Sequence, residues 1–284
     1  MRPSFARFGP ERPRFPAILS VPHAGRDYPQ SLLADCRATP SQLVDLEDRL
    51  ADLLVTDAAQ MGFSGLVAQT PRAIIDLNRS EDEVDPAMLS DPPARTAPLS
   101  VKTRGGLGLV PRRTAALGEL WKRRFSSAEI ESRLALHHRP YHAALANLLR
   151  TARADFGTAI LIDVHSMPPL PDNGAKPAPQ IVIGDRFGRS ADPRFSAHAC
   201  ILAEGWGFRV ARNAPYAGGH ILDRHAAPSR GLHGLQIEID RRLYLDAGLT
   251  QAGEMCGHIA QFVGALAQSL AQMLDAPSGL LAAE

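Results

Sequence analysis

Short runs of apolar residues recur along this chain, and several of them stop at polar side chains. The clearest covers residues 159–162 and is followed by Asp163 and His165. A run of this length, half of it β-branched, is typical of a strand buried on both faces of a sheet. Ala17–Val21 is a second such run, and His23 lies just beyond it. Ligand sites of α/β proteins lie beyond the carboxyl ends of strands, so both histidines are candidate site residues. The alternative is a core strand that ends in a solvated turn.

Further apolar runs and one alternating segment complete the predicted sheet. The alternating segment has one polar face and contains Glu238, and one of the runs is followed by Asn78 and Arg79. These predicted strands cover residues 65–68, 73–77, 180–184 and 235–240.

Helical periodicity separates the strands. Residues 41–61 carry leucines with the three-four spacing of one apolar face, and Ser41 suits the N-cap. Residues 115–154 predict helices that Pro140 should bend or restart. Strands alternating with helices predict an α/β fold, a single three-layer α/β/α domain with a mixed, mostly parallel sheet. The remaining predicted helices are residues 196–206 and 252–274.

Residues 81–113 form a long loop-like stretch between these elements. A structureless segment of this length is commonly a binding loop or lid, and disorder is the alternative. Residues 1–16 contain four prolines and lack the apolar core of a secretory signal. They predict an extended arm ahead of one domain at residues 17–284.

The composition is that of an ordinary globular protein, with 45% hydrophobic and 21% charged residues among 284. A net charge of +1 gives no electrostatic reason to expect nucleic acid or an anionic membrane as a partner. The sequence holds no apolar segment long enough to span a bilayer. Three cysteines without a C-x-x-C pair suit a reducing compartment, so we expect a cytoplasmic protein.

The polar residues near the predicted strand ends differ in chemical kind. Two imidazoles, such as His23 and His165, with one carboxylate make the usual three-ligand set of a catalytic zinc site. A separate carboxylate such as Glu238 can act as general base on water. Arg79 can hold a substrate carboxylate by paired hydrogen bonds. The spacing alone is not diagnostic, because the chain has no H-E-x-x-H motif.

Six short motifs follow one another along most of the chain. They are Ser20-Val21-Pro22-His23-Ala24-Gly25, the acidic pair Glu47-Asp48 followed by Gly62, Arg72 with Asp76-Leu77-Asn78-Arg79, Pro140-Tyr141-His142, residues 163–167, and Gln236-Ile237-Glu238. Each is weak alone, but together and in this order they resemble the motifs of the N-formylglutamate amidohydrolase (deformylase) family.

The resemblance implies a fold like that of the zinc carboxypeptidases and aspartoacylases. It implies a metal-dependent amidohydrolase that cleaves a small N-acyl amino acid, N-formyl-L-glutamate above all, to formate and L-glutamate, as in histidine breakdown. His23 and His165 would be ligands of Zn²⁺ or another divalent metal, with Glu238 as the base. Arg79, together with Asn78, would bind the substrate carboxylate.

The third metal ligand is open between two residues. In the family the first acid of the Glu47-Asp48 pair is often replaced by threonine, which favours Asp48. In a continuous helix, at about 100° per residue, Glu47 instead lies beside the leucine face and Asp48 points away. That objection vanishes if the helix begins only near Asp48. We therefore expect Asp48 as the ligand, with Glu47 as its substitute.

Three more residues carry predictions. Arg224 fits an R-H pair of the family and would contact a second substrate carboxylate. His142, in the Pro140-Tyr141-His142 motif, is a further substrate-binding candidate, and its alternative is simple helix packing. Asp163 either orients one of the histidines or caps a turn.

Two other functions fit the same residues. One is an aspartoacylase- or carboxypeptidase-like hydrolase acting on another N-acyl amino acid or a peptide. The other is a metal-free protein of the same fold that binds carboxylates. The oligomeric state does not follow from the sequence.

Overall fold

The computed structural model describes residues 3–93, 98–172, 174 and 177–275, and the chain divides into two compact units. The first unit comprises Met1–Ala6, Pro22–Arg49 and Val67–Ala144. The second comprises Arg7–Val21, Leu50–Leu66 and Leu145–Glu284. The predicted arrangement of an arm at residues 1–16 and one domain at residues 17–284 stays a prediction.

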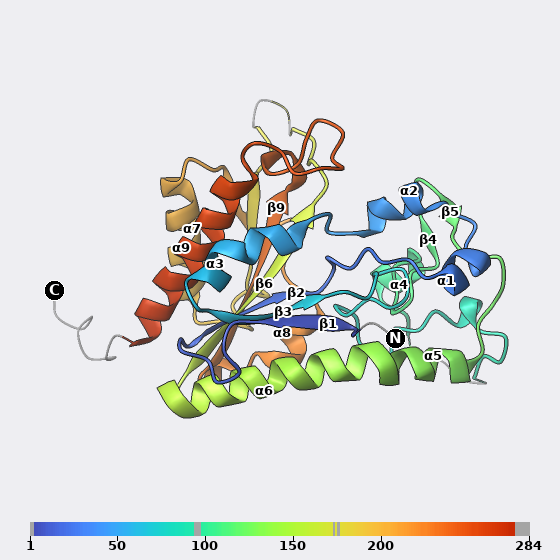
Figure 1. The fold of residues 1–284 in the computed structure, drawn as a ribbon, viewed down its shortest axis with the longest axis horizontal. Coiled ribbons are helices and arrows are strands. Elements are labelled where there is room, and N and C mark those ends of the chain that lie inside the picture. The colour runs from blue at the N-terminus through green and yellow to red at the C-terminus, as the bar shows by residue number, and fades with distance from the viewer. Residues whose placement is uncertain (1–2, 94–97, 173, 175–176, 276–284) are drawn as a thin grey trace. The chain divides into compact units, whose positions relative to one another are not determined.

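A seven-stranded sheet runs in the order β1-β3-β2-β6-β9-β7-β8 (Figure 1). Parallel pairing joins β2 to β6, β6 to β9 and β7 to β8, whereas β7 and β9 are antiparallel. The predicted α/β fold with a mixed, mostly parallel sheet is therefore confirmed. The strands are β1 (Phe5–Phe8), β2 (Ala17–Val21), β3 (Ser64–Ala68), β6 (Ala159–Met167), β7 (Ile181–Gly184), β8 (Val210–Arg212) and β9 (Leu232–Asp240).

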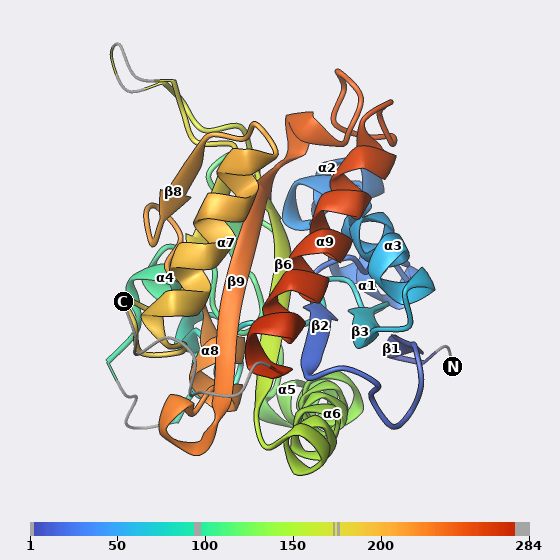
Figure 2. The ribbon, with the colours of Figure 1, turned by 90° about the vertical axis from the view of Figure 1, so that its left-hand side faces the viewer.

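Helices of the second unit cover this sheet. Helices α9 (Cys256–Asp275) and α7 (Pro193–Gly205) lie side by side over one face (Figure 2). Helix α8 (His220–His225) contacts β9 and β6 on the other face. The short α3 (Thr56–Gln60) packs on α9. Among the described residues, no helix is both long and apolar enough to cross a lipid bilayer.

Strand β6 is longer than its apolar run predicts. All nine of its residues are buried, and its parallel ladder with β9 continues from Ala159 to Met167. The prediction that the strand stops before Asp163 was therefore wrong. Strand β9 supplies a ladder partner for both Asp163 and His165, and β2 supplies a second one for Asp163, so these polar residues remain in extended, paired backbone.

The first unit is built mostly of turns and short helices. Residues 73–77, predicted as a strand, form turns instead, and within residues 115–154 the helical part begins only at Ser127. Residues 81–113 hold only short elements, and 94–97 lie outside the described residues. The named elements are α1 (Gln30–Asp35), α2 (Pro40–Leu43), a 3₁₀ turn Pro86–Met88, α4 (Val101–Arg104), β4 (Arg113–Thr114), β5 (Gly118–Glu119), α5 (Ser127–Arg133), a π-helical turn Leu134–His138 and α6 (Arg139–Phe156), whose later part belongs to the second unit.

The continuous helix predicted at residues 41–61 is interrupted. Helix α2 passes into a 3₁₀ turn, Val44–Leu46, and helical backbone resumes as a second 3₁₀ turn, Ala51–Val55. Between them Glu47 is extended, with φ −79° and ψ 151°, and Leu50 is left-handed, with φ 56°. Asp48 and Glu47 therefore lie on irregular backbone, and helical geometry does not decide which way their side chains point.

Candidate active site

Polar side chains gather on one face of the central strands of the second unit. Ser20 on β2 is paired with Asp163 on β6, which is paired with Gln236 on β9. Two positions farther along, His165 is paired with Glu238. Since side chains alternate along a strand and paired residues share a face, all five project from the same side of the sheet. Residues predicted as a metal ligand and a base are thus neighbours on adjacent strands.

Hydrogen bonds fix the orientation of these groups. His165 Nε2 lies 2.8 Å from Asp163 Oδ2, and Ser20 Oγ donates to Asp163 Oδ1 at 2.8 Å. Gln236 Nε2 donates to Glu238 Oε1 at 2.8 Å. Of the two alternatives for Asp163, the structure shows the one in which it orients a histidine, and that histidine is His165.

In the first unit, His23 is held between two carboxylates. Its Nε2 lies 2.8 Å from Asp76 Oδ1, and its Nδ1 lies 3.4 Å from Asp48 Oδ2. The main chain ties the same residues together, because the Asp48 N–H donates to the His23 carbonyl at 3.0 Å. The turn from β2 and the interruption after Val44–Leu46 therefore bring His23 and Asp48 together. Asp163 was predicted to orient one of the two histidines, and the acid that faces His23 is instead Asp76.

Asp76 is fully buried but stays ionised. Burial by itself would raise the pKa of its carboxyl, but Arg72, His23 and Arg79 together hold the pKa well below its usual value. Arg72 Nε donates to Asp76 Oδ2 at 2.8 Å, and the backbone N–H of Asn78 donates to Oδ1 at 2.8 Å. A stable carboxylate at this position keeps a proton on the His23 nitrogen that faces it. In the sequence, the feature that could have indicated this role is that Asp76 is the one acidic residue within the apolar run 73–77.

Glu47 contacts Tyr28 and Arg49. Its Oε1 accepts a hydrogen bond from the Tyr28 hydroxyl at 2.5 Å, and its Oε2 pairs with Arg49 Nη1 at 2.9 Å. Burial, followed by the hydrogen bond to Glu47, raises the pKa of the Tyr28 hydroxyl, so Tyr28 remains a donor. These contacts favour Asp48 over Glu47 as the partner of His23.

Arg79 and Asn78 lie in a buried turn rather than at a strand end. Arg79 Nε donates to the Leu107 carbonyl at 2.8 Å, and Nη1 donates to the Asn78 carbonyl at 2.9 Å. Asp76 Oδ2 is 3.9 Å from Arg79 Nε. The guanidinium is thus fixed by backbone oxygens, with a carboxylate close by.

His142 contacts the backbone of this turn. Its Nε2 is 3.0 Å from the Leu77 carbonyl, and the ring lies 4.3 Å, centroid to centroid, from that of His138. His138 Nε2 is in turn 2.9 Å from the Arg79 carbonyl. The position of His138 on a helix gives no signal of its tertiary partner, so sequence alone does not predict this contact.

Arg224 is exposed near the end of α8. This helix packs against β9 at Gly234, where an added Cβ would lie 3.0 Å from Leu222. Gly234 shares its face of β9 with Gln236 and Glu238. Arg224 therefore belongs to the helix that covers the polar face of the sheet.

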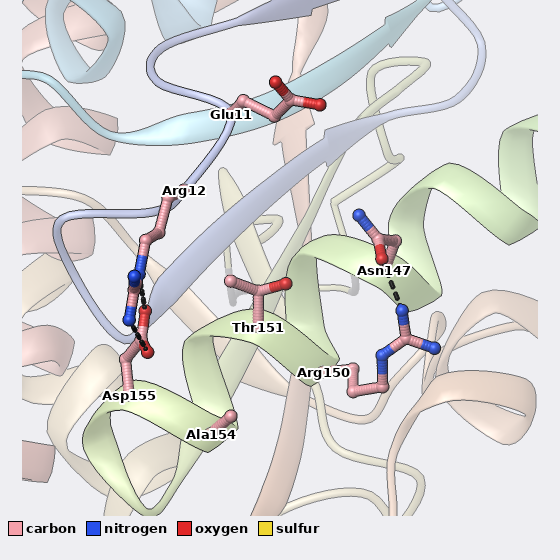
Figure 3. A pocket seen from close by; sticks show the side chains of 7 residues that line it. All are labelled: Glu11, Arg12, Asn147, Arg150, Thr151, Ala154 and Asp155. Atoms are coloured by element: carbon pink, nitrogen blue, oxygen red, sulfur yellow. Dashed lines mark hydrogen bonds and ion pairs between the residues drawn. The ribbon is translucent and has the colours of Figure 1, made fainter.

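A pocket of about 570 Å³ lies elsewhere in the second unit (Figure 3). It lies between α6 and the chain segment before β2. Arg12 is paired with Asp155, and Arg150 donates a hydrogen bond to Asn147. None of the predicted site residues lines it. Its lining residues are Glu11, Arg12, Asn147, Arg150, Thr151, Ala154 and Asp155.

The described residues include imidazole and carboxylate groups of the kind that can hold a metal ion: His23 and Asp48 in the first unit and His165 in the second. Each histidine has its Nε2 engaged by an aspartate. In proteins, such outer carboxylates fix the ring of a metal-binding histidine and raise its basicity.

Comparison with known proteins adds independent information. Residues 15–245 match the family model described as N-formylglutamate amidohydrolase. The N-formylglutamate deformylase of Pseudomonas aeruginosa is 30% identical over 252 residues, 83% of this chain and 84% of that protein. The deformylase of Pseudomonas putida is 27% identical over 237 residues, 82% and 83% of the two chains.

Solved structures agree with these sequence matches. The crystal structure of N-formylglutamate amidohydrolase from Ralstonia eutropha has a TM-score of 0.88 and 30% identity, with 96% of this chain and 99% of that chain covered. A gene product of Agrobacterium tumefaciens, at 18% identity and a TM-score of 0.68 over 97% of both chains, shares the fold.

Proposed function

Because the chain belongs to the N-formylglutamate amidohydrolase family, we propose that it hydrolyses N-formyl-L-glutamate to formate and L-glutamate. The observation that carries the proposal is the register of β6 and β9, which pairs His165 with Glu238 on one face of the sheet. A metal-ligand candidate beside a carboxylate base is the arrangement that metal-assisted hydrolysis needs.

We assign the metal to His23, Asp48 and His165. Ser20 is hydrogen-bonded to Asp163. His23 follows Ser20 by three residues, and three residues of chain span at most about 11 Å. His165 follows Asp163 by two positions on β6. Two imidazoles and one carboxylate suit Zn²⁺, with a further position left for water. Glu47 is the substitute for Asp48, although its bonds to Tyr28 and Arg49 speak against it.

A bound Zn²⁺ would supply Lewis-acid chemistry: it lowers the pKa of water toward about 7 and polarises a carbonyl. Glu238 takes the proton of the attacking water on its carboxylate and passes it to the nitrogen of the leaving amine. Gln236, which donates to Glu238 Oε1, holds the carboxylate in place during both transfers. Asp76 and Asp163 hold the rings of His23 and His165 in one orientation.

The substrate carboxylates call for cationic partners. Arg79, with Asn78 beside it, binds one of them, since a guanidinium held by the carbonyls of Asn78 and Leu107 is already oriented before substrate arrives. Arg224, on the helix over the polar face, binds the second. His142 contributes to substrate binding indirectly, because it contacts the backbone carbonyl of Leu77, next to Asn78 and Arg79.

This reaction fits the last step of a histidine breakdown route that ends in glutamate. We place it in the cytoplasm because Cys36, Cys200 and Cys256 are free thiols, as is usual in a reducing compartment.

Release of formate from N-formyl amino acids, compared with release of acetate from N-acetyl amino acids, tests the proposal, with metal content measured on the same protein. We expect N-formyl-L-glutamate to be the best substrate. Glu238→Gln should retain its metal and fold while losing roughly 10²- to 10⁴-fold in kcat. Glu254→Gln, at an exposed position, is the control and should match wild type. Absence of formate release from zinc-loaded wild type would refute the function, and a Glu238→Gln rate above about a tenth of wild type would place the base elsewhere.

A further inference from the structure

The turn that carries Asp76, Asn78 and Arg79 is held by side chains of one helical segment. Arg133 Nη1 donates to the Ile74 carbonyl at 2.9 Å. His142 and His138 reach the next carbonyls, of Leu77 at 3.0 Å and of Arg79 at 2.9 Å. Three carbonyls within six residues thus receive their donors from the segment between 133 and 142.

The turn needs such donors, because its backbone belongs to no strand or helix. A buried carbonyl outside a ladder costs free energy unless it finds a partner. Both histidines are buried, and a carbonyl oxygen only accepts, so each Nε2 carries the proton in these bonds. At positions 138 and 142 a leucine would fill space but leave the two carbonyls without these donors.

The π-helical turn Leu134–His138 brings the three donors to one side of the segment. In a regular α-helix Arg133 and His138, five positions apart, would point about 140° away from each other. In a π-turn the backbone bond spans five residues, so the side chain five positions on returns toward the same face. His142 then follows His138 at the ordinary four-residue spacing of α6.

We propose that His138 and His142 are positioning residues for substrate capture, acting through the carbonyls of Arg79 and Leu77 to set the place of the Asn78-Arg79 pair. This proposal rests on the proposed function, in which Arg79 binds a carboxylate of the substrate. Arg79 in turn is bonded to the Asn78 carbonyl, so a shift of this backbone moves the guanidinium with it.

Two substitutions at each histidine distinguish loss of the hydrogen bond from a change in side-chain volume. The amide nitrogen of glutamine lies about as far from the backbone as histidine Nε2, whereas that of asparagine lies about as far as Nδ1. His142→Gln should therefore keep the bond to Leu77 and His142→Asn should lose it. The same pair at His138 tests the bond to Arg79.

Steady-state kinetics on N-formyl-L-glutamate and its two mono-amides give the first measurement. We expect both asparagine variants to lose about ten- to a hundredfold in kcat/KM on the acid, mostly through KM, because a displacement near 1 Å can cost this much. The glutamine variants should stay close to wild type. The amide that lacks the carboxylate bound by Arg79 should lose less than the acid.

Hydrogen exchange of the backbone amides at residues 74–80 gives a second measurement, which does not depend on activity. It should speed up in the asparagine variants and not in the glutamine variants. Equal exchange in His142→Asn and wild type, or equal losses on acid and both amides, would overturn the positioning role. A wild type that releases no formate would refute the proposed function instead, and the exchange comparison would still decide whether the histidines hold the turn.

Discussion

At the residue scale, the two histidines of the candidate site have the same local arrangement in different units. His23 Nε2 faces Asp76 and His165 Nε2 faces Asp163, each at 2.8 Å. This leaves Nδ1 as the ring atom that we assign to the metal in both. An aspartate at each Nε2 fixes the tautomer and prevents the ring from turning.

Substitution of these two aspartates should weaken metal binding without removing a ligand. We expect Asp76→Asn and Asp163→Asn each to lower zinc affinity about 10- to 100-fold, since an amide orients imidazole but does not raise its basicity. Competition with a coloured chelator measures this. Asp185→Asn is the matched control, because Asp185 is also buried but bonds to Ser196, Arg212 and Asn213. A control that loses as much zinc would mean that the effect reflects stability alone.

Substitutions of Glu47 and Asp48 test which of these two neighbouring acids binds the metal. Asp48→Asn should remove most of the bound metal, because the carboxylate next to His23 Nδ1 loses its charge. Glu47→Gln should keep the metal and lower the melting temperature, because Glu47 instead holds Tyr28 and Arg49. Metal analysis of both variants, with exposed Asp45→Asn as control, decides between them. The reverse pattern would make Glu47 the ligand.

At the element scale, the buried strands were predictable and the irregular segments were not. Ala17–Val21 occurs as predicted, and residues 65–68 lie within β3, because an apolar run of that length has few alternatives to a core strand. The strand predicted at residues 73–77 is apolar in the same way, but it forms turns whose carbonyls are satisfied by side chains of another segment. Single-sequence patterns do not encode such distant donors.

The interruption of the helix predicted at residues 41–61 has a similar cause. Its leucine spacing is helical on both sides of the break, and both flanking pieces are indeed helical. The apolar pattern does not predict the left-handed backbone of Leu50. The candidate site residues could therefore be named from motifs, whereas the geometry that distinguishes Asp48 from Glu47 required the structure.

The left-handed backbone at Leu50, where the predicted helix is interrupted, can be tested by measuring protein stability. A non-glycine residue in left-handed backbone costs roughly 1–2 kcal/mol, and a β-branched one is worse tolerated. We expect Leu50→Val to destabilise the protein beyond the loss of one methylene. The control is Leu53→Val, at a similarly half-buried position inside the 3₁₀ turn Ala51–Val55. A melting temperature about 2–4 °C lower for Leu50→Val than for Leu53→Val is expected, and equal values would contradict the strain.

At the scale of the whole molecule, the proposed ligands are divided between the two compact units. Pro22–Arg49 contributes His23 and Asp48, and Leu145–Glu284 contributes His165. The chain passes from one unit to the other just before His23 and just after Asp48, so each of these ligands lies close to a crossing. A metal bound by these residues would add its binding energy to the free energy of unfolding.

Thermal unfolding with and without metal tests this. Protein stripped with a chelator should melt lower than zinc-loaded protein, because a ligand at about 1,000 times its Kd adds about 4 kcal/mol to the free energy of unfolding. For a chain of this size the shift is on the order of 10 °C. Asp48→Asn, from one unit, and His165→Ala, from the other, should each abolish most of the shift. Glu254→Gln should keep it, since that exposed side chain is assigned no part in metal binding. A shift that survives in His165→Ala but not in Asp48→Asn would confine the metal to the first unit and contradict the three-residue ligand set.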